Sequence, residues 1–259
     1  MAWLIKAAQL DKFRKTQKNI IIMDATWFLP QSQRQAKEAF ALQHIIDAKF
    51  FAMELFHEHP SQQPHDNMVI TDVEAINAKL GSLSIRNESR IIFYDNSDIH
   101  TACRAVWMMQ LFGHPTQQLY ILDGGLQAWK DYGGKVESGE PNYTTKTYTA
   151  DLDLTLLRNL SQMKSNLYQP CEQVIDLRHA VRYAGGPELK PHLRSGHIPG
   201  SFSFPVKSFF EKDGTFKPLD KLKQQLNAMG VDLKAPIVST CGSGMSAPCL
   251  LYTSPSPRD

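Results

Sequence analysis

The sequence has few of the features that mark several large protein classes. It holds only four cysteines in 259 residues and no CxxC pair, which argues against a disulfide scaffold and against a zinc site. No apolar run approaches the roughly 20 residues of a membrane span, and the N-terminus lacks the apolar core of a signal peptide. The 28 Lys and Arg residues nearly balance the 26 Asp and Glu residues, so the net charge of +2 gives no basic footprint for nucleic acid. We therefore expect a cytoplasmic chain with neither a nucleic-acid nor a membrane partner.

The chain does have enough apolar sequence for two folded domains. Hydrophobic residues make up 42% and charged residues 21%, fractions that fit a soluble globular protein. Three landmarks occur twice in the same order, about 150 residues apart. They are residues 20–25 and 174–178, residues 44–48 and 197–201, and residues 91–95 and 237–241. Chance recurrence of common strand residues is the alternative, but the shared order and spacing favour a duplicated domain.

Each half alternates short apolar runs with helical patterns, such as residues 72–80 and 219–229. This alternation predicts an α/β fold of two tandem domains, each a mainly parallel sheet flanked by helices. We place an N-terminal domain at 1–135, a linker rich in Gly, Pro and Thr at 136–150, and a second domain at 151–250.

The second half lacks counterparts of some elements of the first. After residue 95 the first half predicts a helix at 103–112, a strand at 119–122 and a further helix, whereas only residues 242–259 follow the second landmark. The prolines at 255 and 257 oppose a helix there. We therefore expect an incomplete second domain, a non-native tail at 251–259, and a chain that aggregates and has little or no activity.

A glycine-rich loop follows the strand predicted to end at Thr240. Gly242 and Gly244 permit a tight turn in which successive backbone N–H groups form an anion cradle. Such a cradle favours the thiolate of Cys241, which would then serve as a nucleophile or a sulfur carrier. A buried structural cysteine followed by a simple turn is the other interpretation, and the spacing alone leaves both open.

Several ordered motifs together give a family resemblance over nearly the whole chain. Cys-Gly-Ser-Gly-Met-Ser-Ala at 241–247 resembles the active-site loop of 3-mercaptopyruvate sulfurtransferases, and Gly-His-Ile-Pro-Gly at 196–200 matches a motif of that family. Residues 104–108 and 122–126, together with Trp129, are also similar to it. The chain thus resembles a tandem rhodanese-type sulfurtransferase.

The resemblance implies that the second domain is catalytic and that the first is an inactive copy, with Asp95 in the nucleophile's position. Cys241 would take sulfur from 3-mercaptopyruvate as a persulfide and pass it to a thiol such as thioredoxin or glutathione, or to cyanide, with no metal or organic cofactor. The implied substrate-binding residues are Arg182, Lys190, Gly242, Ser243, Gly244, Met245 and Ser246.

The charge of the loop that follows Cys241 indicates which sulfur donor the chain would use. Gly242 and Ser243 are neutral where thiosulfate-preferring relatives carry basic residues, so the resemblance favours 3-mercaptopyruvate, with thiosulfate as the alternative. Arg182 aligns with an arginine that binds the substrate carboxylate, whereas Lys190 replaces a second arginine and lacks its planar fork.

The first half departs further from the family. The family's acid and histidine that lie behind the active-site serine correspond to positions near Glu54 and Asn67, and nearby His65 could substitute for the histidine. His100 stands where relatives usually carry an aromatic residue.

Two other functions compete with sulfur transfer. A phosphatase of this fold needs a Cys-x5-Arg loop, and Ala247 stands in the arginine position, so we reject that function. A non-catalytic binding module remains the further alternative. Cys103, Cys171 and Cys249 are expected to be packing residues, and His197 is expected to fix a turn.

Overall fold

The structure is a computed structural model that describes residues 4–57, 72–188 and 193–253. The chain divides into two compact units, residues 1–154 and 155–259. Each unit holds a parallel sheet with helices packed around it, which confirms the predicted α/β class.

The first unit is built on a five-stranded parallel sheet in the order β1–β6–β5–β2–β4. Its strands are β1 (Leu4–Ile5), β2 (Ile20–Asp24), β3 (His44–Ile45), β4 (Lys49–Phe50), β5 (Arg90–Tyr94), β6 (Leu119–Leu122) and β7 (Val136–Glu137). Its α-helices are α1 (Ala7–Thr16), α2 (Ala36–Leu42), α3 (Val73–Ser82), α4 (Ala102–Leu111) and α5 (Gly125–Asp131), with 3₁₀ turns at Pro30–Ser32, Met53–Phe56 and Thr116–Gln118. The short strands β3 and β7 pair separately and antiparallel.

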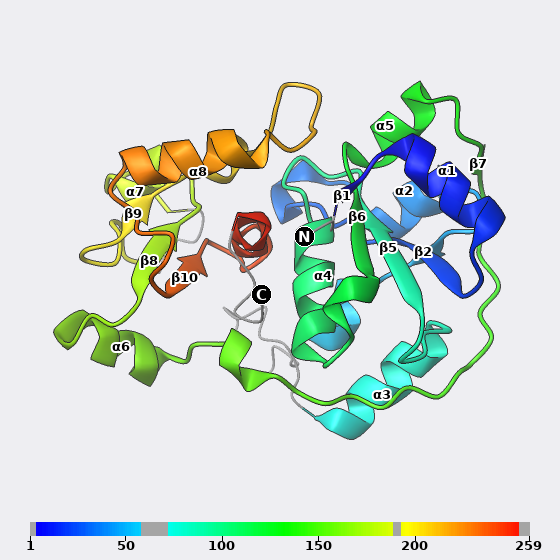
Figure 1. The fold of residues 1–259 in the computed structure, drawn as a ribbon, viewed down its shortest axis with the longest axis horizontal. Coiled ribbons are helices and arrows are strands. Elements are labelled where there is room, and N and C mark those ends of the chain that lie inside the picture. Colours follow the sequence, from blue (N-terminus) through cyan, green and yellow to red (C-terminus); the bar gives the residue numbers. More distant parts are fainter. Residues whose placement is uncertain (1–3, 58–71, 189–192, 254–259) are drawn as a thin grey trace. The chain divides into compact units, whose positions relative to one another are not determined.

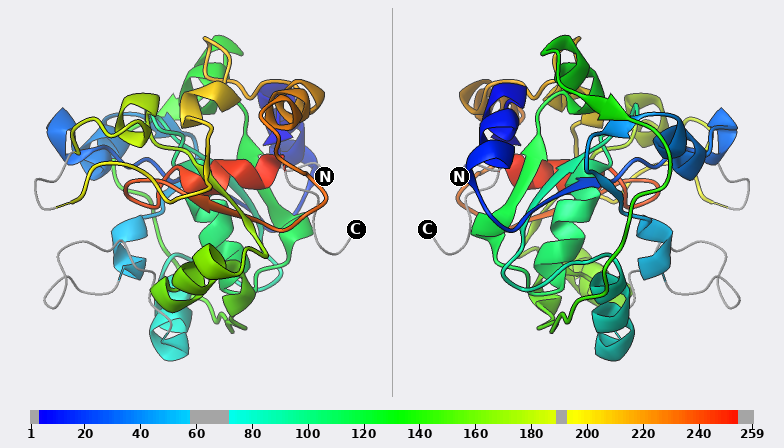
Figure 2. Two further views of the ribbon diagram at one scale, coloured as in Figure 1. Left: turned by 90° about the vertical axis from the view of Figure 1, so that its left-hand side faces the viewer. Right: turned by 90° about the vertical axis from the view of Figure 1, so that its right-hand side faces the viewer.

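Both faces of this sheet are covered. Residues 91–94 of β5 are all buried, as a continuous apolar run in a parallel sheet requires. On one face, Ile92 shares a core cluster with Leu10 of α1, Phe40 of α2 and Trp129 of α5. Neighbouring side chains point to the opposite face, and α4 packs there against β5 and β6. Figures 1 and 2 show this sheet lying between its helices.

The second unit holds a three-stranded parallel sheet in the order β10–β8–β9. Its strands are β8 (Gln173–Asp176), β9 (Phe202–Ser203) and β10 (Ile237–Thr240), and its α-helices are α6 (Leu160–Tyr168), α7 (Ala180–Tyr183) and α8 (Leu219–Ala228). The 3₁₀ helices η5 (Val206–Phe209) and η6 (Ala247–Tyr252) also belong to this unit, and η4 (Leu154–Leu156) crosses the boundary at which the chain divides. Gly230 follows α8 with a φ of 88°, a conformation that favours glycine and is common just after a helix ends.

The sheet order β10–β8–β9 matches the order β5–β2–β4 in the first unit. Asp176 pairs in register with Thr240, as Asp24 pairs with Tyr94. Cys241 and Asp95 are therefore the first residues after equivalent strands. Among the described residues, the second sheet has no counterparts of β6 and β1.

Two predicted segments pack more closely than expected. Residues 136–150, predicted as a linker, lie along the first unit, where the Lys146 N–H donates to the Gly81 carbonyl at 3.0 Å. Of the segment predicted as a tail, residues 251 and 252 belong to η6 and residue 253 follows directly. The Tyr252 ring lies 4.7 Å from that of Phe216, and Thr253 is buried. Residues 254–259 lie outside the described part.

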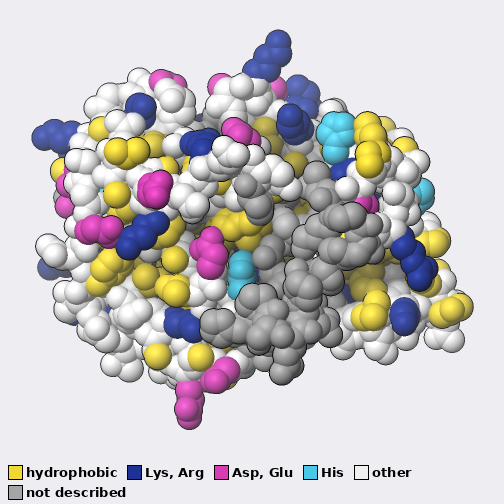
Figure 3. Space-filling model, turned by 180° about the vertical axis from the view of Figure 1, so that it is seen from behind, with side chains coloured by type: hydrophobic (Ala, Val, Ile, Leu, Met, Phe, Trp, Pro, Cys, Tyr) yellow, Lys and Arg dark blue, Asp and Glu magenta, His cyan; other side chains and the backbone are white. Residues whose placement is uncertain are grey.

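On the face seen from behind, apolar side chains lie in small groups among charged ones (Figure 3). Within the described residues, no helix is both long enough and apolar enough to cross a bilayer.

Candidate active site

The sulfur of Cys241 sits at the carboxyl end of β10, inside a tight backbone turn. Its side chain is half-buried, and the N–H of Gly244 donates to Sγ at 3.1 Å. Gly244 has a φ of 74°, a conformation that residues with a Cβ adopt only with strain. The glycine spacing predicted a backbone cradle, and the structure shows one donor of that cradle directed at the sulfur.

The remaining loop residues take different positions. Met245 and Ser246 are buried, so contributions from them to a ligand would come from the backbone. The carbonyl of Ser246 accepts the N–H of Cys249, which anchors the start of η6. Ser243 is half-buried and Gly242 is exposed, which leaves these two at the accessible side of the loop.

Arg182 reaches this loop from α7. A Cβ placed on Gly242 would lie 2.8 Å from Nη1 and 2.9 Å from Nη2 of Arg182, closer than Cβ contacts in proteins allow. The missing side chain at Gly242 therefore makes room for the guanidinium. The structure thus brings together Cys241 and the arginine expected to bind a carboxylate.

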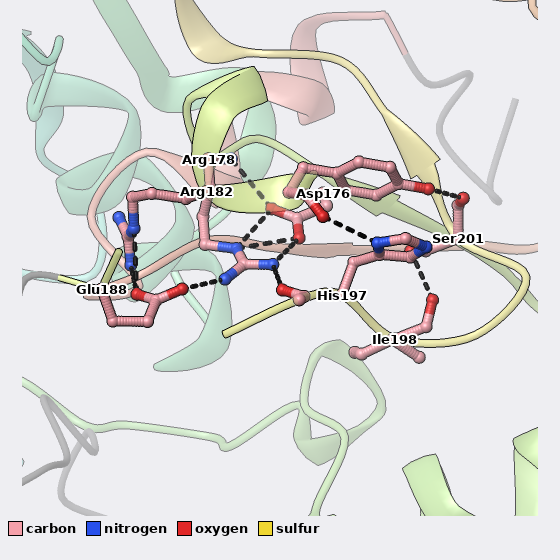
Figure 4. A network of polar contacts seen from close by, with 9 residues as sticks. Asp176, Arg178, Arg182, Glu188, His197, Ile198 and Ser201 are labelled. Atoms are coloured by element: carbon pink, nitrogen blue, oxygen red, sulfur yellow. Dashed lines mark hydrogen bonds and ion pairs between the residues drawn. The ribbon is translucent and has the colours of Figure 1, made fainter. Parts of the chain in front are cut away.

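A buried carboxylate that the sequence did not reveal holds Arg182 in place. Glu188, whose side chain is 3% exposed, accepts from Nε of Arg182 at 2.9 Å and also from its Nη2. The second oxygen of Glu188 accepts from Nη1 of Arg178 at 2.6 Å. Figure 4 shows Glu188 between the two guanidinium groups.

The series of ion pairs that begins at Arg182 ends at Asp176 in the sheet. Arg178 donates to both oxygens of Asp176, the buried last residue of β8, and to the carbonyl of Gly196. Bonding to Asp176 is the main reason why the pKa of Arg178 is raised. We call Asp176, Arg178, Arg182 and Glu188 the arginine network. Its two cations and two carboxylates give a formal charge of zero.

His197 has a structural position beside this network. Its ring stacks on Tyr183 with centroids 3.8 Å apart, and its Nδ1 contacts the Tyr183 carbonyl at 2.7 Å. Because a carbonyl only accepts, Nδ1 carries the proton in this contact. The Tyr183 hydroxyl in turn donates to the carbonyl of Ser201, next to β9.

Asp95 of the first unit binds its own turn. Its Oδ1 accepts from the N–H and the hydroxyl of Ser97, at 3.0 and 2.7 Å, and its Oδ2 accepts from the Ala102 N–H at the start of α4. The carboxylate thus occupies the donors of its loop, and a carboxylate offers no thiol to carry sulfur.

The other predicted residues divide into three groups. Cys103 and Cys249 are buried, as expected of packing residues. The expectation for Cys171 was wrong: it is exposed in the turn before β8, where its thiol contacts Asn166 Oδ1 at 3.4 Å. Lys190, His65 and Asn67 lie outside the described residues.

Metal ions in proteins are bound by clusters of ligating side chains. Within the described residues, no group of three or more His, Cys, Asp or Glu side chains could hold a metal ion.

Comparisons with known proteins agree with this geometry. The rhodanese-like domain family matches residues 6–132 and 159–254. The chain is 32% identical over 243 residues to the 3-mercaptopyruvate sulfurtransferase of Mus musculus, covering 93% of this chain and 80% of that protein. It is also 32% identical over 257 residues to the mitochondrial thiosulfate/3-mercaptopyruvate sulfurtransferase 1 of Arabidopsis thaliana, covering 91% of this chain but 66% of that protein.

A solved structure extends the likeness to the fold. SseA from Escherichia coli, described as a 3-mercaptopyruvate sulfotransferase with the rhodanese fold, superposes with a TM-score of 0.86 at 27% identity. The match covers 98% of this chain and 93% of SseA.

Proposed function

The chain belongs to the rhodanese-like family of sulfurtransferases, and we propose that it moves sulfur from 3-mercaptopyruvate through a persulfide on Cys241 to a thiol acceptor. The observation that carries this proposal is the N–H of Gly244 directed at Cys241 Sγ, beside the guanidinium of Arg182. The loop can thus stabilise negative charge on sulfur, and the arginine can receive a carboxylate.

In the first half-reaction, the Cys241 thiolate attacks the sulfur of 3-mercaptopyruvate. A bond forms between the two sulfurs while the carbon–sulfur bond of the substrate breaks. The bonding electron pair leaves with the carbon as the enolate of pyruvate, which takes up a proton. The transferred sulfur remains on Cys241 as a persulfide, and the N–H of Gly244 is placed to hold the negative charge that reaches the loop.

In the second half-reaction, an acceptor thiolate attacks the outer sulfur of the persulfide. The sulfur–sulfur bond breaks, its electron pair returns to Cys241 as thiolate, and the acceptor leaves as a persulfide. Thioredoxin and glutathione are the acceptors that we propose, and cyanide would leave as thiocyanate. Because the enzyme alternates between two covalent forms, the kinetics are expected to be ping-pong.

The arginine network supports 3-mercaptopyruvate over thiosulfate as the donor. Arg182 bonds Glu188 through Nε and Nη2, and its Nη1 lies 2.8 Å from the position of a Cβ on Gly242. Both Nη atoms lie beside the loop, and Nη1 is the one that does not donate to Glu188, so the guanidinium suits a single carboxylate. The network's formal charge of zero favours a monoanion over the thiosulfate dianion.

A cyanolysis assay tests this function. Thiocyanate is measured with 3-mercaptopyruvate and with thiosulfate at equal concentrations, for the wild-type chain and for Cys241→Ser. However slow the turnover of the wild-type chain, we expect its kcat/KM to be higher for 3-mercaptopyruvate than for thiosulfate, and we expect background rates from Cys241→Ser. Higher kcat/KM with thiosulfate would contradict the choice of donor, whereas activity retained in Cys241→Ser would contradict the whole proposal.

A further inference from the structure

A cavity in the first unit lies away from the loop that follows β5. It has a volume of about 260 Å³. Its walls come from the starts of β2 and β4, the loop after α3, the turn before β5 and residues 144–146. Because β2 and β5 are parallel and in register, their starts lie at the amino edge of the sheet, opposite the edge where Asp95 follows β5. Nothing in the proposed sulfur transfer uses this cavity.

The charges lining the cavity do not cancel. Asp47 is paired with Arg14 at 2.7 Å, and Glu88 is paired with Arg86 at 3.3 Å. Lys49 and Lys146 also line the cavity, and neither has a carboxylate within ion-pair distance among the described residues. Two ammonium groups of the described chain therefore face the cavity without a paired carboxylate.

These two lysines are close enough to repel each other. Partial burial and, secondly, the charge of Lys146 lower the pKa of Lys49. The repulsion would be relieved by a negatively charged group bound between them. The arrangement of the two ammonium groups thus favours an anion in this cavity.

Ser84 adds a directed hydrogen-bond donor. Its hydroxyl oxygen accepts from Lys49 Nζ at 2.7 Å and from the Thr144 N–H at 2.9 Å, which fills both lone pairs. The side chain is largely buried, and its own O–H hydrogen has no acceptor among the described protein groups. Ser84 also has a φ of 67°, an uncommon conformation for a residue with a Cβ.

We propose that this cavity binds a tetrahedral oxyanion of the phosphate or sulfate type between Lys49 and Lys146, with the Ser84 hydroxyl donating a third hydrogen bond. A dianion satisfies both ammonium charges, and several oxygens can accept from three donors together. One water molecule occupies about 30 Å³ in the liquid, so a cavity of about 260 Å³ also admits an organic tail on the oxyanion. The ligand is thus either a free anion or the end group of a phosphate monoester.

Amine labelling of the 259-residue chain tests the site at residue level. The protein is acetylated briefly at constant ionic strength, with increasing inorganic phosphate or glycerol phosphate replacing chloride, and the peptides are quantified by mass spectrometry. We expect acetylation of Lys49 and Lys146 to fall several-fold and to saturate, whereas Lys130, an exposed lysine on α5, stays unchanged. The probe that binds more tightly shows whether the anion is free or the end group of an ester.

A variant separates binding from general salt effects. In Lys146→Gln, loss of one charge-assisted hydrogen bond should weaken phosphate protection of Lys49 about tenfold or more, and Lys130→Gln should leave it unchanged. Circular dichroism is used to check that both variants are folded. The proposal would be overturned if neither probe protected Lys49 and Lys146 from acetylation. Equal protection of Lys130, or protection of Lys49 that Lys146→Gln does not weaken, would also overturn it.

Discussion

The guanidinium of Arg182 occupies the space that a side chain on Gly242 would need, with Nη1 2.8 Å from the position of the missing Cβ. Gly242, which follows the proposed nucleophile, and Arg182, which we propose receives the substrate carboxylate, are therefore linked by sterics. A larger residue at 242 and a guanidinium at 182 cannot both keep their present positions.

The first prediction follows from this contact. Gly242→Ala should displace the Arg182 guanidinium and raise KM for 3-mercaptopyruvate about tenfold, with a smaller change in kcat, because a charge-assisted hydrogen bond is worth about 1.5–3 kcal/mol. Steady-state kinetics in the Arg182→Ala background serve as the control. There the added methyl group has no guanidinium to displace, so Gly242→Ala should have little further effect. An equal loss in both backgrounds would contradict the steric link.

The second prediction concerns Glu188. Glu188→Gln keeps the shape of the arginine network but changes its formal charge from zero to +1. At about 8 Å and an effective dielectric of about 40, one extra unit charge is worth about 1 kcal/mol. The ratio of kcat/KM for thiosulfate to that for 3-mercaptopyruvate should therefore rise about fivefold. If Glu188→Gln changed kcat/KM for both donors by the same factor, Glu188 would only support the fold.

The third prediction is a pH dependence of stability in the first unit. Asp24 is buried, and burial raises its pKa to about 6 despite hydrogen bonds from Thr26. A folded-state pKa above the ordinary value of 3.8 means that stability is full below that value and falls as the pH rises towards 6. Asp24→Asn should remove this loss.

Urea unfolding at pH 4.5 and 7.5 measures the effect. The gain in the free energy of unfolding from Asp24→Asn should be larger at pH 7.5 than at pH 4.5 by about 1–2 kcal/mol. Asp131→Asn, at an exposed position on α5, is the matched control. A gain that is the same at both pH values would show that Asp24 ionises without cost in the folded chain.

The sequence predicted the helices and strands of each half better than the side-chain contacts between them. The strand expected at residues 119–122 is β6, because a largely buried parallel strand reads as a continuous apolar segment. The run that ends at Thr240 is β10, whose residues are only half-buried. The helix expected from residue 72 begins at Val73, since Asp72 caps it by accepting the N–H groups of Glu74 and Ala75. Short strands such as β4 and β9 carry too few residues for a periodic signal.

The site was predictable only in part. The glycine spacing indicated the turn around Cys241, and the family resemblance supplied Arg182. Glu188 lies in no helix or strand, so no periodic pattern points to it, and its two ion pairs depend on how the loop after α7 folds back. Cys171 was misjudged because the strand β8 begins only at Gln173, and a residue in the preceding turn need not share the burial of the strand.

Intact-protein and peptide mass spectrometry after a single exposure to 3-mercaptopyruvate tests the central claim most directly. It detects one sulfur transfer to the chain even where turnover is slow. Cys171 is the internal control, because it is exposed but lies in an ordinary turn, where no backbone N–H of the described residues is shown donating to its sulfur. We predict one added sulfur on the peptide that contains Cys241, none on the peptide that contains Cys171, and loss of the adduct in Cys241→Ser. An adduct on Cys171, or an adduct that survives Cys241→Ser, would contradict the assignment of Cys241 as the sulfur carrier.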